Sequence, residues 1–407
     1  WRARALTSIH ATLNTGENAR EMLWPMATFF SSMVDESQHR FYYVSFPQST
    51  GERRIHDHCP IRDLGAAWDA TTALLFWKNQ QKWLLETNNE DDFQKFQKRL
   101  KDAVYSTLQV YNESYDSINS EDNGGVSLSV NSLMEPPHIA HSGFVILTTI
   151  GALKLSLFSQ GKMPPIDGLT RGILSRQRED GAFQVRFESS DVFKGIEFYS
   201  GEAMVALMEA YGLDAPNVVD EWTRKAILPA MKRAFAFYSS YFRQGDVAEN
   251  YHIWQAQAFT RLFYALHQSD ETDDKNLSFD VSHYVLELCH GIVDSRSWKE
   301  LSRGRSFYPN LSSVEIACGL DAIAQGICVA IDTSQLQEAE LFWNNAKHGV
   351  SYLQFLQDQV SRDSSCFGGI GFGGIQVLEQ RLDVTGHAIG ALTKIYEVND
   401  RVQAVNR

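Results

Sequence analysis

The sequence predicts an all-α fold in which six helical hairpins close into an (α/α)6 toroid. Apolar residues recur at spacings of three and four through most of the 407 residues, whereas alternating, strand-like runs are few and short. The helical segments fall into pairs, and the second member of each pair is apolar around most of its circumference. Because six pairs is the number that closes such a ring, we expect closure. The structural alternative is an open two-layer helical solenoid.

Start and stop signals predict twelve helices. In chain order they span residues 16–33, 62–77, 93–114, 138–158, 166–178, 200–211, 219–243, 250–267, 280–300, 312–331, 337–360 and 383–397. Second members of the pairs, such as 138–158, are rich in alanine, glycine and apolar residues, as a helix packed on several sides must be. First members, such as 93–114, carry one polar face. We therefore expect six buried helices inside six amphipathic ones.

A single toroid domain covering residues 1–407 is the expected organisation. No linker rich in proline, glycine or serine divides the chain, and only 117–136 and 268–279 are polar and loop-like. A hydrophobic content of 43% is enough for a large core, and the sequence offers no run of about 18 apolar residues, so we expect no membrane insertion of the visible chain. The sequence leaves the compartment and the oligomeric state open.

The charge distribution excludes some partner classes. The chain has 37 basic and 50 acidic residues, a formal net charge of −13, and no basic cluster interleaved with aromatic residues. This pattern argues against a nucleic-acid surface or an anionic membrane surface, and favours partners that are neutral, or acidic only where local positive ends gather. A small-molecule or oligosaccharide substrate is compatible with it. The five cysteines are an odd number for a disulfide scaffold, so free thiols are expected.

The amino-terminal ends of the predicted inner helices carry acids and imidazoles. If these helices run parallel in a ring, all six ends open on one face, where unpaired backbone N–H groups and aligned dipoles favour negative charge. The residues at these ends are Arg62, Asp63, His138, His141, Glu202, Tyr251, His252, Glu315, Asp383 and His387. The sequence therefore predicts a site at the mouth of the ring.

Carboxylates beside histidine and arginine point to general acid–base catalysis, because this chemistry needs groups whose environments push their pKa values apart. Asp383 and His387 are the first candidates, with Arg381 orienting them or binding an anion. The further catalytic candidates are Glu202, Glu315, His252 and Asp63. Any one of these acids, taken singly, is also typical of a helix cap or dipole partner.

Three strings resemble known motifs. QREDGAF at 177–183, YSGEAMVAL at 199–207 and QRLDVTGHAIGAL at 380–392 are similar to motifs of the six-hairpin, α/α-toroid superfamily of glycan-active enzymes and uncharacterised prokaryotic toroid proteins. The resemblance implies a hydrolase, lyase or epimerase of an oligo- or polysaccharide, with acidic residues and a histidine or tyrosine at the ring mouth. In the first string Gly181 supplies backbone freedom, Phe183 packs into the ring wall, and Asp180 is also placed to cap the turn.

Residues of two kinds are expected to bind the substrate. Aromatic rings stack on pyranose faces, and charged or polar groups hold hydroxyls or a uronate carboxylate. The substrate-binding candidates are Arg381, Arg62, His141, Asp180, Tyr199, Trp254, Trp68 and Tyr43. A hydrolase would use two facing carboxyls from Asp63, Asp180, Glu202, Glu315 and Asp383. A lyase or epimerase would instead use His387, His252 or Tyr251 to take a proton.

Other functional classes stay open as alternatives. The chain lacks the aspartate clusters of isoprenoid cyclases. The Cys289–His290 pair resembles the zinc-binding segment of lanthipeptide cyclases, but it lies in an amphipathic first helix and is expected to be packed. A second metal candidate is His56, Asp57, His58 and Cys59, which lacks a matched distant cluster. We expect no metal and no organic cofactor. A ring that binds a peptide or glycan without turnover is the non-enzyme alternative.

Overall fold

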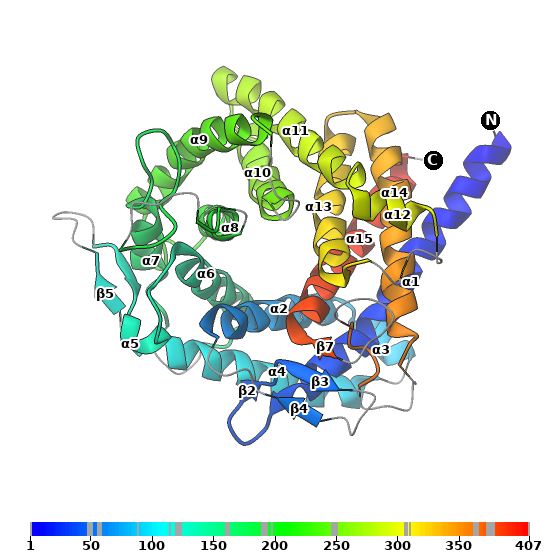
Figure 1. Cartoon of the computed structure of the whole chain (residues 1–407), viewed down its shortest axis with the longest axis horizontal. Helices are drawn as coiled ribbons and strands as arrows, with labels where there is room; N and C mark the ends of the chain where they lie inside the picture. Colours follow the sequence, from blue (N-terminus) through cyan, green and yellow to red (C-terminus); the bar gives the residue numbers. More distant parts are fainter. Residues whose placement is uncertain are drawn as a thin grey trace. The chain divides into compact units, whose positions relative to one another are not determined.

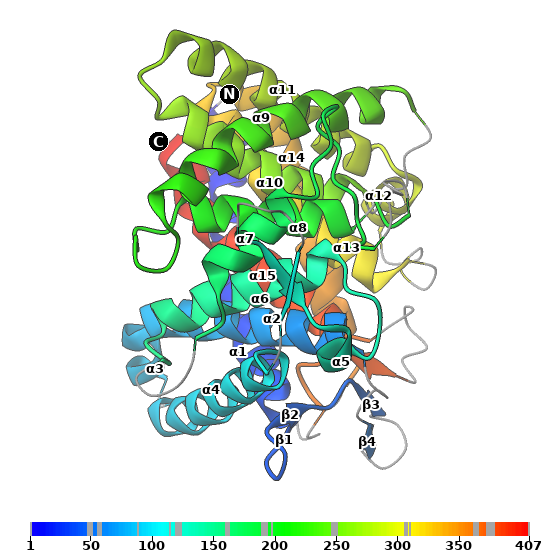
Figure 2. The same cartoon turned by 90° about the vertical axis from the view of Figure 1, so that its left-hand side faces the viewer.

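The computed structural model confirms that the chain is mostly helical, with 72% helix and fifteen helices in the described residues (Figures 1 and 2). The structure describes residues 2–46, 52–54, 59–87, 89–113, 115–118, 124–158, 163–188, 194–196, 198–245, 251–304, 308, 311–360, 366–371 and 379–405, without the side chains of 2–14 and 52–54.

All twelve predicted helical segments are helices in the structure. They are α1 (Arg2–Ser32), α2 (Pro60–Asn79), α4 (Glu90–Tyr111), α6 (Ile139–Lys154), α7 (Ile166–Leu174), α8 (Tyr199–Tyr211), α9 (Glu221–Arg243), α10 (Tyr251–His267), α11 (Thr272–Val293), α13 (Ser313–Asp332), α14 (Leu336–Gln357) and α15 (Leu382–Val405). Three short helices were not predicted: α3 (Gln81–Glu86), α5 (Val130–Leu133) and α12 (Arg296–Ser302).

One predicted helix is broken in two. The sequence pattern at 280–300 predicts a continuous helix, whereas α11 ends at Val293 and α12 begins at Arg296. Ser295 causes the break, because its hydroxyl accepts a hydrogen bond from the Trp298 N–H at 3.3 Å and so starts a new helix as an N-cap.

The chain divides into two compact units. Unit 1 comprises Trp1–Asp57, Thr72–Leu100 and Val285–Arg407, and unit 2 comprises His58–Thr71 and Lys101–Tyr284. Three of the four boundaries fall inside helices, in α2, α4 and α11. The single domain over 1–407 stays a prediction.

Unit 2 is built around the neighbouring helices α6, α8 and α10. Helix α8 packs between the other two, while α7 packs on α6 and α9 packs on α7 and α8 (Figure 1). Glycines allow the close approach: a Cβ on Gly143 would lie 3.3 Å from the Ala203 Cα, and one on Gly201 would lie 2.4 Å from the Trp254 Cβ. The apolar circumference predicted for these helices thus corresponds to packing on several sides.

Unit 1 joins the two ends of the chain. Helix α13 packs on α14 and α15, and α1 packs on α14 and α15. Strand β3 (Val44–Phe46) pairs antiparallel with β4 (Glu52–Arg54) and with β7 (Gln380–Arg381), which places Val44 opposite Arg381. Helix α13 is long and apolar enough to cross a membrane by length and composition. However, 72% of its apolar window is buried within the protein, as in a core helix.

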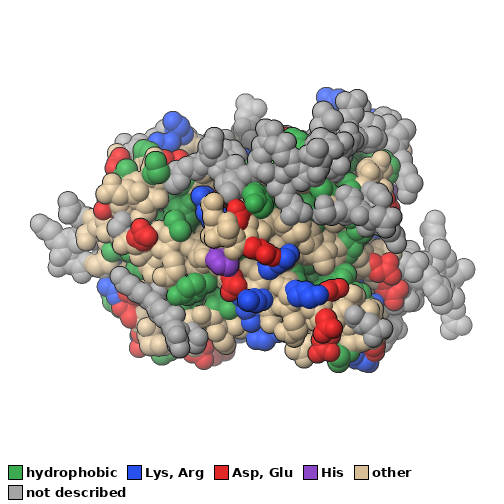
Figure 3. All heavy atoms as spheres, turned by 90° about the horizontal axis from the view of Figure 1, so that it is seen from below, with side chains coloured by type: hydrophobic (Ala, Val, Ile, Leu, Met, Phe, Trp, Pro, Cys, Tyr) green, Lys and Arg blue, Asp and Glu red, His purple; other side chains and the backbone are tan. Residues whose placement is uncertain are grey.

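Each unit also contains one small antiparallel strand pair. Strand β1 (Val34–Asp35) pairs with β2 (Arg40–Phe41) in unit 1, and β5 (Tyr115–Ser117) pairs with β6 (Val126–Leu128) in unit 2. On the face shown in Figure 3, basic side chains lie among acidic ones and do not form an area of their own.

Candidate functional site

Unit 2 brings together predicted site residues from the first turns of several helices. Arg62 and Asp63 lie in the first turn of α2, His141 in that of α6, and Tyr199 and Glu202 in that of α8. His252 and Trp254 lie in the first turn of α10. We call this group, with Glu135 and His138, the unit 2 cluster.

Three stacked rings form the centre of the cluster. The His138 ring stacks on His141, with centroids 3.5 Å apart and planes at 25°, and on Tyr199, with centroids 4.1 Å apart and planes at 17°. His138 therefore lies between the other two rings. His138 directly precedes α6, and its backbone forms an antiparallel bridge with Arg186, which fixes its position.

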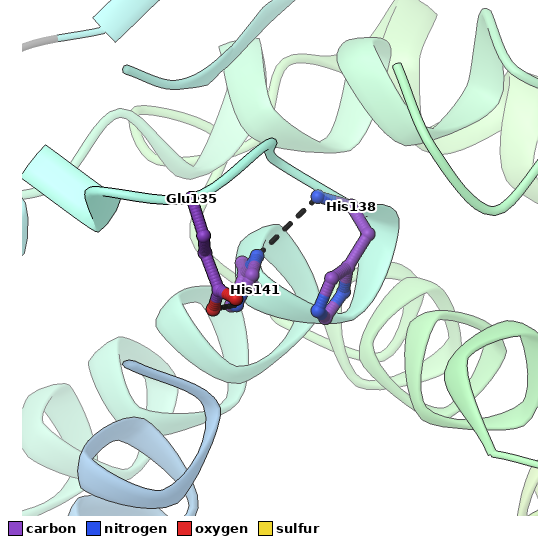
Figure 4. A group of neighbouring side chains, drawn as sticks. All are labelled: Glu135, His138 and His141. Atoms are coloured by element: carbon purple, nitrogen blue, oxygen red, sulfur yellow. Dashed lines mark hydrogen bonds and ion pairs between the residues drawn. The ribbon is translucent and has the colours of Figure 1, made fainter. Parts of the chain in front are cut away.

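Glu135 and the His138 backbone fix the tautomer of His141. The Nε2 atom of His141 lies 3.1 Å from Oε1 of Glu135, and its Nδ1 accepts a hydrogen bond from the His138 N–H at 3.3 Å (Figure 4). An accepting Nδ1 leaves the proton on Nε2, which donates to the carboxylate. Glu135 was not predicted as a site residue, although its spacing in E-x-x-H-x-x-H was a signal in the sequence.

Both histidines are held in the neutral form. Burial, together with His141 and Arg186, lowers the pKa of His138 to about 2. Burial also lowers the pKa of His141, although the carboxylate of Glu135 acts in the opposite direction. At neutral pH these rings are neutral imidazoles, so they are poor proton donors.

Glu202 differs from an ordinary surface carboxylate because its carboxyl group is neutral rather than ionised at neutral pH. Only 7% of the residue is exposed, and its Oε2 has no hydrogen-bond partner among the described residues. Burial raises the pKa of Glu202 to about 8. The carboxyl group is therefore protonated at neutral pH and able to donate a proton. Burial raises the pKa of the Tyr199 phenol, and the charge of Glu202 raises it further. Tyr199 therefore lies near the Glu202 carboxyl group.

Further unpaired polar groups lie at the same level of the neighbouring helices. Ser142 in α6 and Gln255 in α10 are buried, and neither the Ser142 hydroxyl nor the Gln255 amide has a hydrogen-bond partner among the described residues. The close approaches at Gly143 and Gly201 place these residues level with Glu202. An unpaired buried polar atom costs roughly 1–3 kcal/mol, so this polar layer is suited to a hydrogen-bonding ligand or to ordered water.

Three aromatic rings, from α2, α6 and α10, lie close together in unit 2. The Trp68 ring lies 5.7 Å from that of Phe144 and 5.7 Å from that of Trp254, measured between centroids. Trp254 is buried, whereas Trp68 is partly exposed. The structure thus brings together two of the rings predicted to stack on a sugar. Of the other two, Tyr199 belongs to the histidine stack, and Tyr43 lies in unit 1, where its hydroxyl donates to Asp383.

The start of α2 is tied to the same cluster. The Asp63 carboxylate accepts a hydrogen bond from the Tyr111 hydroxyl at 3.0 Å. Burial raises the pKa of the neighbouring Cys59 thiol, while Arg62 lowers it and Glu135 and Asp63 raise it further. Glu135 is therefore close to the first turn of α2.

His252, in the first turn of α10, packs edge-on against Phe242, with centroids 5.2 Å apart.

Asp383 and its neighbours form a separate group in unit 1. Asp383 accepts hydrogen bonds from Arg381 Nε at 3.1 Å, from the Tyr43 hydroxyl at 2.7 Å and from its own helix at Val384 N. The Arg381 guanidinium also lies 5.2 Å from the centre of the Tyr43 ring. Burial would raise the pKa of Asp383, but Arg381, Tyr43 and His387 outweigh it and lower the pKa. This carboxylate is ionised and engaged in local structure.

Two other predicted acids are held by local hydrogen bonds. Glu315 accepts from the Ser297 hydroxyl at 3.1 Å, and its own N–H is capped by Ser312. Asp180 is exposed, pairs with Arg178 and accepts from the Ala182 N–H, as a turn residue does. Gly181 next to it has φ +96°, and a Cβ there would lie 2.2 Å from the Arg233 carbonyl oxygen. The expected freedom of this glycine is thus a requirement of the turn.

The two metal candidates of the sequence have different outcomes. His56, Asp57 and His58 lie outside the described residues. Cys289 is buried, its thiol donates to the Ala322 carbonyl at 3.3 Å, and burial raises its pKa to about 12. His290 pairs with Glu338 at 2.8 Å. Cys289 is thus packed, as expected, whereas His290 is partly exposed and pairs with Glu338. Among the described residues, a different group, Glu135, His138 and His141, has ligand atoms within 4.8 Å of one another.

Comparison with known proteins adds no assignment: no protein-family model matches this sequence, and a search of curated proteins gives no match.

Proposed function

We propose that the chain is a glycan-active enzyme in which Glu202 is the general acid. The observation that carries this proposal is the buried Glu202 carboxyl group, which has an unpaired oxygen and a pKa raised to about 8. A carboxyl group that stays protonated at neutral pH can give its proton to the glycosidic oxygen while the bond to the anomeric carbon breaks. Among the described residues of the motifs at 177–183, 199–207 and 380–392, Glu202 is the one carboxyl group whose pKa is raised.

The neighbours of Glu202 support a hydroxyl-rich substrate. The Ser142 hydroxyl and the Gln255 amide offer donors and acceptors that have no partner among the described residues. Trp68 and Trp254 supply flat apolar surface in the same unit, which suits the faces of a sugar ring. The unit 2 cluster holds two further carboxylates, Asp63 and Glu135, and we assign Asp63, a catalytic candidate of the sequence, the role of base for the attacking water.

We also propose that the helix pairs close into the (α/α)6 ring predicted from the sequence. The support is the match of eleven of the twelve predicted helices, the remaining one being divided at Ser295, and the multi-sided packing of α6, α8 and α10. A crystal structure of the full chain tests this proposal, because an open arrangement of the pairs would contradict it.

The test of the enzymatic proposal is a screen of neutral and acidic oligosaccharides with the wild type and two matched variants. Glu202→Gln keeps the size of the side chain but cannot donate an acidic proton. Glu209→Gln, on the same helix, changes a glutamate that is paired with Arg261 and Lys154. We expect a loss of about 10³-fold in kcat for Glu202→Gln and little loss for folded Glu209→Gln.

The pH profile provides a second readout. Because Glu202 must be protonated, activity of the wild type should fall as the pH rises through about 8. Full activity of Glu202→Gln would contradict the proposal. Oligosaccharide binding without any turnover would instead identify the chain as a binding protein and would also overturn it.

A further inference from the structure

We propose that Glu135, His138 and His141 form a binding site for a divalent zinc ion. The side chains come from the segment that leads into α6 and from its first turn, and their ligand atoms lie within 4.8 Å of one another. In Figure 4 the three side chains extend to the same side of this segment, with the Glu135 carboxylate beside the His141 ring. This inference is independent of the glycan-active function proposed above.

The donor set fits zinc by its chemistry. Two imidazole nitrogens and one carboxylate oxygen are a common zinc ligand set, and they leave a fourth position for water or a substrate. Zinc–ligand bonds of about 2.0–2.2 Å place tetrahedral ligand atoms roughly 3.3 Å apart. The 3.1 Å between His141 Nε2 and Glu135 Oε1 already has this spacing. The third ligand atom has to move closer, which requires the His138 ring to turn out of its stack with His141 and Tyr199.

The state of His138 is the second observation. The residue is 93% buried, and its Nδ1 has no hydrogen-bond partner among the described residues. A buried nitrogen without a partner is costly, and coordination of a metal ion would satisfy it. Glu135, by contrast, has 44% of its side chain exposed, so an ion can reach the site from its side.

Binding also requires a proton shift on His141. The Nε2 atom of His141 carries the proton while Nδ1 accepts the 3.3 Å hydrogen bond from the His138 N–H. Coordination through Nε2 moves that proton to Nδ1 and opens this bond. Because the bond is long, its loss is small compared with the formation of metal–ligand bonds.

The experiment is a titration of the chelator-treated full-length chain with zinc chloride, followed by calorimetry and by metal analysis after gel filtration. We expect one zinc per chain. Glu135→Gln keeps the size and hydrogen-bonding capacity of the side chain but removes its charge, and His138→Gln removes a ring nitrogen. Each should weaken the binding of zinc at least tenfold. His290→Gln is the matched control, because His290 also faces a glutamate, at 2.8 Å, and should leave the affinity unchanged.

Cobalt provides a readout that does not depend on activity, since the visible absorption of bound Co²⁺ reports tetrahedral coordination. Loss of this absorption in folded Glu135→Gln, checked by circular dichroism, supports the site. Failure of the folded wild type to take up stoichiometric zinc would overturn it, as would wild-type affinity in folded Glu135→Gln. Because Glu135 is partly exposed, this variant remains informative even where His138→Gln fails to fold. Catalytic activity enters neither readout, so failure of the zinc site and failure of the enzymatic proposal are distinguishable.

Discussion

Glu202 in unit 2 and Asp383 in unit 1 occupy equivalent places in their helices but differ in electrostatic state. Each is an acid in the first turn of a buried helix, α8 or α15. Burial raises the pKa of Glu202 to about 8, whereas Arg381, Tyr43 and His387 outweigh burial and lower that of Asp383. The difference teaches that partners, not position at a helix end, decide whether a buried acid is a proton donor or a structural anion.

The largest expected effect is on the pH dependence of stability, through Glu202. Its pKa is 4.5 in the unfolded chain and about 8 in the folded one, so the wild type loses stability as the pH rises between these values. At about 1.4 kcal/mol per pH unit the loss is at most ~5 kcal/mol. Glu202→Gln lacks this loss, so its stability relative to the wild type should rise from pH 5 to pH 9. Urea unfolding at both pH values measures it, and a parallel pH dependence of the two proteins would remove the contrast with Asp383.

Glu209 sharpens the comparison within a single helix. Burial would raise its pKa, but Arg261 and Lys154 lower it to about 2. The stabilisation is therefore present above pH 4.5 and lost as the pH falls through 2. We expect Glu209→Gln to be about 3 kcal/mol less stable at pH 7 and to show a weaker acid dependence. Thermal or urea unfolding at pH 7 and pH 3 checks this, and unchanged stability would show that solvent screens the pair.

Asp383→Asn should act in the opposite direction from Glu202→Gln. It breaks a half-buried ion pair and leaves Arg381 without its carboxylate, which should cost about 2 kcal/mol at pH 7. Because the pKa is lowered from 3.8, the difference between the variant and the wild type should shrink as the pH falls below about 4. A variant as stable as the wild type at pH 7 would show that the ion pair contributes nothing.

Tyr43→Phe gives the smallest effect, through loss of the 2.7 Å hydrogen bond to Asp383. We expect a loss of about 1 kcal/mol in the wild type and a smaller loss in Asp383→Asn. Unfolding of the two single variants and of the double variant provides the cycle. Additive losses would show that the hydroxyl does not act through Asp383.

The sequence predicts the helices well because their periodicity is local. It also predicts correctly that Asp180 belongs to a turn, since the glycine after it is a local signal. The states of Glu202 and Asp383 are not predictable in this way. Tyr43 is 340 positions away from its partner, and the environment of Glu202 comes from neighbouring helices. Glu135 was missed because it lies in a loop, outside the helical pattern that guided the choice of candidates.

The pairing of strand β3 with β7, and of helix α1 with α15, sets the order in which the chain acquires structure. Residues near position 44 pair with residues near position 381, so unit 1 cannot be completed until the chain beyond position 381 has left the ribosome. Lys101–Tyr284, most of unit 2, is continuous and emerges earlier. Truncating the last helix should therefore leave nascent chains with exposed apolar surface on α1 and α13 and make them dependent on chaperones.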